Sequence, residues 1–100
     1  MQHSIKEDSN LRSFFDYLFI EKGLSKNTIK AYEVDIERFI QWLKQNNKSD
    51  YLNAKETQIN KYISHLFKTH LKSSSINRKI SSIKAFYLFL MKKNILKVSP

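Results

Sequence analysis

The chain of 100 residues contains no cysteine, a single glycine and a single proline. Without cysteine it can form neither a disulfide framework nor a thiolate metal site, which is compatible with a reducing cytoplasm. Tight hairpin turns draw on glycine, so its scarcity favours long helices joined by short connections. His65 and His70 have no third ligand in view and His3 is remote from both, so we expect no metal site and no cofactor.

Long apolar runs are also missing. The longest covers residues 86–91, whereas a membrane-spanning helix needs about 20 apolar residues. The N-terminus is polar and of mixed charge, without the apolar core of a signal peptide. We therefore expect a soluble, cytoplasmic protein with no membrane partner, and 100 residues are enough for one domain with its own core.

Acidic residues are absent from the second part of the chain. All nine Asp and Glu lie in residues 1–56, where nine Lys and Arg balance them. The other nine Lys and Arg, and with them the whole net charge of +9, lie in residues 57–100. This separation favours a polyanionic partner through a sequence-independent attraction. The alternative is that a lysine-rich surface serves solubility alone.

Patterns of a catalytic site are lacking too. The sequence has no glycine-rich phosphate loop, no H-E-x-x-H motif and no Ser or Cys nucleophile near a plausible base. We therefore predict that this chain is not catalytic alone and takes no small-molecule substrate. A module that binds DNA or a protein partner is the better class.

Four apolar stripes with helical spacing predict four main helices near residues 9–22, 26–45, 54–69 and 74–93, and no sheet. Gly23 is expected to end the first helix and Asn94 the fourth. Polar residues predict where the helices begin, in chain order Ser4 with Glu7 or else Ser9, then Ser25, then Asn53 with Glu56, then the serines 73–75.

The fourth predicted helix carries most of the functional signal. Its apolar stripe consists of Ile76, Ile80, Ile83, Tyr87 and Leu90. Helical spacing puts Arg78, Ser81, Ser82 and Ala85 on the opposite face, with Asn77 and Lys84 on one flank and Lys79 on the other. Small side chains let a backbone approach a partner closely, and the cations favour an anionic one. The alternative is that the small residues form a solvated face or a tight contact with another helix.

The start of the second predicted helix is a second candidate. Lys26, Asn27, Thr28 and Lys30 combine cations and hydrogen-bond donors with free backbone N–H groups, an arrangement that can hold a phosphate. The preceding turn, residues 23–25, is typical of a helix-turn-helix regulator. However, the helix that follows is too long for a recognition helix, and the most basic helix is the fourth.

Three motifs in order resemble the N-terminal core-binding domain of tyrosine recombinases, of the Xer and phage-integrase type. They are a Phe-x-x-x-Leu pair in the first predicted helix, the run from Glu21 to Tyr32 with Asp35 three residues on, and the run from Leu71 to Tyr87. The resemblance extends from about Leu11 to Pro100.

This resemblance implies an all-α, SAM-like fold of four to five helices in two crossed helical hairpins. It implies a domain that clamps one side of a recombination site in double-stranded DNA, where other recombinase protomers also bind. The catalytic residues of the family belong to a C-terminal domain that this chain lacks. Residues 1–100 are then a single DNA-binding domain, and a linker begins near 98–100. The competing interpretation is a stand-alone helical protein–protein adaptor with an incidental basic face.

Members of that family place their second and fourth helices against DNA. The matching candidates here are Lys26, Asn27, Thr28 and Lys30 on the second predicted helix, and Ser74, Ser75, Asn77, Arg78, Lys79, Ser82 and Lys84 on the fourth.

Overall fold

The computed structural model describes residues 8–46 and 50–96. Within them it has four helices, α1 (Ser9–Ile20), α2 (Lys26–Asn46), α3 (Glu56–Phe67) and α4 (Ser73–Lys92), and none of these residues lies in a strand. Every helix end falls within two residues of its predicted place. This confirms the all-α class. None of the helices in this part of the chain has the length and apolar character needed to cross a membrane.

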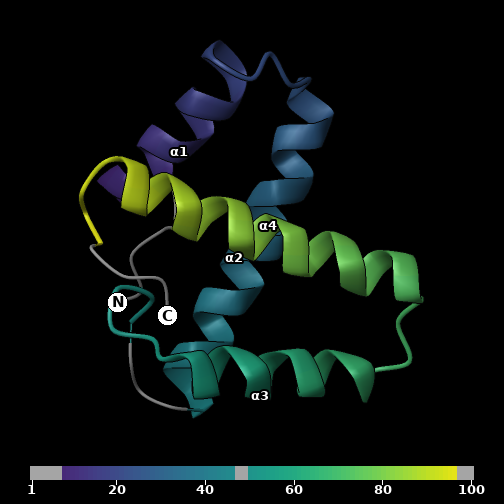
Figure 1. Cartoon of the computed structure of the whole chain (residues 1–100). Coiled ribbons are helices and arrows are strands. Elements are labelled where there is room, and N and C mark those ends of the chain that lie inside the picture. Colours follow the sequence, from purple (N-terminus) through teal and green to yellow (C-terminus); the bar gives the residue numbers. More distant parts are fainter. Residues whose placement is uncertain (1–7, 47–49, 97–100) are drawn as a thin grey trace.

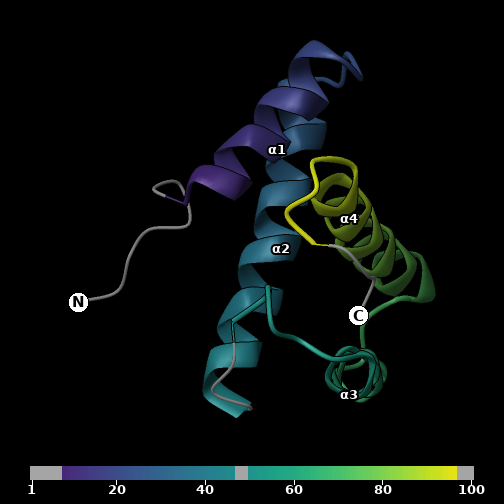
Figure 2. The same ribbon diagram turned by 60° about the vertical axis from the view of Figure 1, so that its left-hand side comes forward.

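The helices form two hairpins that cross. Figure 1 shows α1 and α2 joined at the top, and α3 and α4 running in opposite directions one beneath the other. The helix α4 passes across the middle of α2, and Figure 2 shows the same crossing from another side, with α3 seen nearly end-on. Both α2 and α4 pack against all three of the other helices, so the crossing of these two is the centre of the fold.

Aromatic rings fill the space between the hairpins. Phe14, Phe39, Phe86 and Phe89 are fully or almost fully buried. The ring of Phe14 lies 5.3 Å from that of Phe86 and 5.4 Å from that of Phe89, which joins α1 to α4. Burying each ring contributes about 1.5–3 kcal/mol before entropy is subtracted. The core therefore fixes where α4 lies relative to α1.

The helix starts follow the prediction only in part. The Ser25 hydroxyl accepts the Thr28 N–H at 3.2 Å, as predicted for α2. The cap of α1 is Asp8 rather than Ser9, since the Asp8 carboxylate accepts the N–H groups of Asn10 and Leu11. The alternative cap, Ser4 with Glu7, lies outside the described residues.

The predicted caps of α3 and α4 were wrong. Asp50 accepts the Asn53 N–H in the preceding loop, so α3 begins later, with Gln58 accepting the Lys55 N–H. In α4 the serines 73–75 are already helical, and Lys72 precedes them without a side-chain cap. Both predicted ends were right: Gly23 and Asn94 adopt left-handed conformations with φ of 63° and 59°.

The buried face of α4 is wider than its predicted stripe and rotated toward Lys79, Ser82 and Phe86, all of which are buried. The outward face predicted for Ser82 was therefore wrong. Ala85 is half-buried against the core rather than outside. The physical reason is that α4 has three helices to cover, and one stripe of isoleucines cannot cover them all.

Candidate nucleic-acid interface

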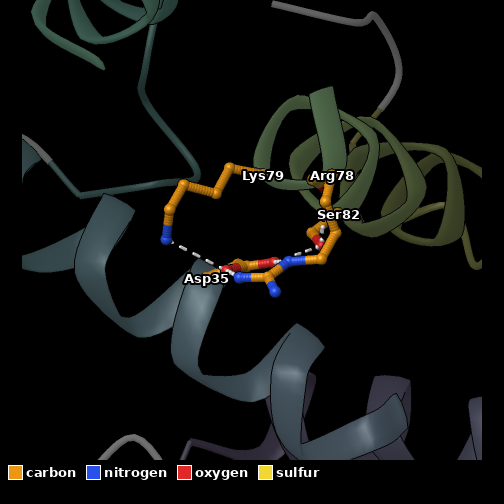
Figure 3. Close-up of polar contacts among 4 residues, drawn as sticks. All are labelled: Asp35, Arg78, Lys79 and Ser82. Atoms are coloured by element: carbon orange, nitrogen blue, oxygen red, sulfur yellow. Dashed lines mark hydrogen bonds and ion pairs between the residues drawn. The ribbon is translucent and has the colours of Figure 1, made fainter. Parts of the chain in front are cut away.

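A polar cluster joins α2 to α4 where the two helices cross. The Asp35 side chain of α2 is fully buried, and three side chains of α4 hold it (Figure 3). Arg78 donates from Nε to Oδ2 at 3.1 Å and from Nη2 to Oδ1 at 2.9 Å. Lys79 Nζ lies 3.2 Å from Oδ1, and the Ser82 hydroxyl donates to Oδ2 at 2.9 Å. Both carboxylate oxygens therefore have two donors.

The sequence spacing explains why this cluster forms. Arg78, Lys79 and Ser82 lie within about one turn of α4 and so can converge on one carboxylate. A buried carboxylate without partners is strongly destabilising, whereas paired and hydrogen-bonded charges are tolerated. Within the described parts of the chain, the two ion pairs of Asp35 are the only ones present. The cluster therefore specifies how the two hairpins meet.

Two of the predicted DNA-binding residues belong to this cluster and face inward. Ser82 is 2% exposed and the Lys79 side chain 10% exposed. The small Ser82 lets α4 approach α2 closely. For Ser82, the alternative of a tight contact with another helix is therefore correct. Neither side chain presents its polar atoms on the surface, and this corrects their expected placement.

The other candidates lie on the outside. Lys26, Asn27, Thr28 and Lys30 are exposed in the first turns of α2, although the Thr28 hydroxyl also lies 2.9 Å from that of Ser25. On α4, one candidate, Ser75, is partly exposed, and four are exposed: Ser74, Asn77, Lys84 and Arg78, whose side chain is 52% exposed.

The two groups of exposed residues lie on the halves of α2 and α4 that extend from the helix crossing. The N-terminal halves of α2 and α4 diverge from it (Figure 1). Lys26 lies nine residues before Asp35, about 14 Å along the axis of α2. Ser74 lies eight residues before Ser82, about 12 Å along α4. Each helix thus directs a positive N-terminal dipole away from the same point.

Asp35 lies within one of the sequence motifs, but its role at the helix crossing was not predicted. A signal was available, since Asp35 is a lone acid among the inward residues Tyr32, Ile36 and Phe39 of α2. Helical spacing placed it on the apolar side, where a carboxylate needs a partner. Its partners lie more than 40 residues further along the chain, so the sequence did not identify them.

Three tyrosines are held in the core. Burial raises the pKa of Tyr62 to about 12, and the nearby Asp35 charge adds to this. Burial also raises the pKa values of Tyr51 and Tyr87. The Tyr87 hydroxyl donates to the Tyr51 carbonyl at 2.7 Å, and the Tyr51 hydroxyl donates to Asp8. These phenols therefore stay protonated at neutral pH and serve as structural groups.

The described residues do not gather into a metal-binding cluster. Residues 8–46 and 50–96 contain no group of three or more His, Asp or Glu placed to hold a metal ion. What they do offer is a set of surface cations, hydroxyls and amides around one helix crossing. Chemically, this arrangement can bind an anionic polymer.

Comparisons with known proteins agree with this fold. The family profile "Phage integrase, N-terminal SAM-like domain" matches residues 11–94. The chain is similar to tyrosine recombinase XerC of Pediococcus pentosaceus, with 38% identity over 87% of this chain. It is also similar to tyrosine recombinase XerD of Rickettsia prowazekii, with 39% identity over 90% of the chain, and to XerC of Listeria monocytogenes, with 32% over 96%.

The matched segment is a limited part of these relatives, since the chain covers 29%, 29% and 32% of their respective lengths. No solved structure matches the chain. The profile match spans most of the sequence, with α1 from its third residue and α2, α3 and α4 in full. The chain therefore belongs to the family of phage integrase N-terminal SAM-like domains.

Proposed function

We propose that this chain is the DNA-binding N-terminal domain of a tyrosine recombinase, and that it clamps duplex DNA at a recombination site. The catalytic groups would lie outside this chain, which covers about three tenths of its recombinase relatives. The buried, protonated tyrosines support this division, because a nucleophilic tyrosine must be reached by DNA and lose its proton. Residues 1–100 then act as one domain in the cytoplasm, beside other protomers on the same DNA.

The observation that carries the proposal is the surface at the helix crossing. Exposed cations lie on both α2 and α4. No acidic residue follows Glu56 in the described chain, so α4 carries none. The charge therefore attracts a phosphate backbone, while the two diverging helices supply hydroxyl and amide donors along it.

We assign direct contact with DNA to the candidates that lie outside and an internal role to Lys79 and Ser82. The direct set is Lys26, Asn27, Thr28, Lys30, Ser74, Ser75, Asn77, Arg78 and Lys84. Lys and Arg would contact phosphates, and the amides and hydroxyls would reach phosphates or base edges.

The test is a titration of a labelled random-sequence duplex with the 100-residue chain at several salt concentrations. We expect binding at low salt that weakens steeply as salt rises, with a log–log slope of about 0.9 for each phosphate neutralised. No binding at low salt, or an affinity that salt does not change, would favour the adaptor function instead.

A further inference from the structure

The cluster at the helix crossing holds more positive charge than its carboxylate needs. Lys79 alone would balance the charge of Asp35, and it is the buried cation of the two. Arg78 is the second cation, and its side chain is half-exposed. The cluster therefore has a net charge of +1, and the surplus lies at its outer edge.

The geometry at Arg78 leaves one side of the guanidinium unused. Asp35 takes the N–H groups of Nε and one of Nη2, so the group is held by two parallel bonds. Figure 3 shows the third nitrogen with no partner among the residues drawn. In the described part of the chain it has no acceptor within hydrogen-bond distance. Since a guanidinium carries five N–H groups in a fixed plane, fixing one edge also fixes the direction of the other.

We infer that Asp35 is a positioning residue of the DNA interface, holding the Arg78 guanidinium oriented so that its outer N–H groups meet a backbone phosphate. The inference rests on the proposed DNA-binding function. An unanchored arginine loses much of its rotamer freedom when it binds. Here Asp35 has already restricted that freedom in the free protein, which lowers the entropic cost of the phosphate contact.

The substitution Asp35→Asn tests this because charge and positioning predict opposite results. Removing a negative charge from a DNA-binding protein should by itself raise its affinity for DNA. If Asp35 positions Arg78, the asparagine variant should instead bind a labelled random-sequence duplex about three- to tenfold more weakly. Glu37→Gln is the matched control, since it makes the same charge change two residues along α2, and it should bind at least as tightly as the unmodified chain.

A double-mutant cycle shows whether Asp35 acts through Arg78. In the Arg78→Ala background, Asp35→Asn should no longer weaken DNA binding, because no guanidinium remains to be oriented. A structural role exerted through Lys79 and Ser82, which remain in this background, would weaken binding in both backgrounds, and that result would overturn the inference. Tighter binding by Asp35→Asn, equal to that of Glu37→Gln, would overturn it too.

If Asp35→Asn does not fold, as judged by circular dichroism, the half-exposed Arg78 supplies the deciding variant. Arg78→Lys keeps the charge but cannot form the paired bonds to the carboxylate. We expect it to bind DNA about three- to tenfold more weakly with an unchanged salt slope. Affinity equal to that of the unmodified chain would overturn the inference. Absence of DNA binding by the unmodified chain would instead overturn the proposed function.

Discussion

Tyr62 and Tyr87 are both buried, yet only the Tyr87 hydroxyl forms a hydrogen bond within the described residues. The Tyr87 hydroxyl donates to the Tyr51 carbonyl, whereas the Tyr62 hydroxyl has no partner among the described residues. At neutral pH, Tyr87→Phe should lower the free energy of unfolding by about 1–2 kcal/mol, because a buried carbonyl loses its donor. Tyr62→Phe should change it little. Urea unfolding followed by circular dichroism measures both.

At alkaline pH, Tyr62→Phe should be more stable than the unmodified protein. Its pKa in the folded protein is raised from 10.0 to about 12. Between these values the unfolded chain loses the phenolic proton while the folded chain keeps it, so the stability falls as the pH rises. Tyr62→Phe removes this loss, and the variant should therefore become more stable than the parent in that range. An unchanged difference between the two proteins at neutral and alkaline pH would contradict this assignment.

The candidate residues on α2 could be placed from the sequence, whereas those that contact Asp35 could not. The candidates on α2 lie on the surface, as residues expected to hold a phosphate must. Lys79 and Ser82 were misplaced because helical spacing describes one helix at a time. Their inward orientation depends on a carboxylate 44 and 47 residues away, respectively.

At the scale of elements, apolar periodicity predicted each helix and its approximate bounds, since four stripes had to be covered. The width of a buried face depends on how many neighbours a helix has. For α4 these are three helices, which no local pattern records. Caps were similarly uncertain at α3, where Asp50 competes for the N–H of Asn53.

The helix ends offer a test of backbone conformation without packing. Gly23 has φ of 63°, and a Cβ built there would meet nothing within 4 Å. Gly23→Ala should therefore lower the free energy of unfolding by about 1–2 kcal/mol through the left-handed conformation alone. The control is Asn94→Gly, which relieves the same conformation at the end of α4 and should not destabilise the protein. Thermal unfolding of both variants checks this, and an unchanged melting temperature for Gly23→Ala would refute it.

For the whole molecule, the net charge and the placement of the charge predict different modes of DNA binding. A charge of +9 attracts DNA to any face, whereas the proposed interface uses the N-terminal halves of α2 and α4. The opposite end of α2 packs against α3, where the rings of Trp42 and Tyr62 lie 5.2 Å apart. A lysine at the start of α2 and a lysine on α3 therefore distinguish the two explanations.

Lys26 and Lys61 form the matched pair. Both are exposed. Lys61 precedes Tyr62, whose ring contacts that of Trp42 on α2. Trp42 lies sixteen residues after Lys26, about 24 Å along the axis of α2. This separation exceeds the Debye length of about 10 Å at 0.1 M salt, so the two positions act nearly independently on a bound phosphate. Lys26→Gln should lower the slope of log affinity against log salt by about 0.9, the value for one lost phosphate contact. Lys61→Gln should leave the slope unchanged although it removes the same charge. Equal slopes for the two variants would mean that total charge, rather than the surface at the helix crossing, governs binding to DNA.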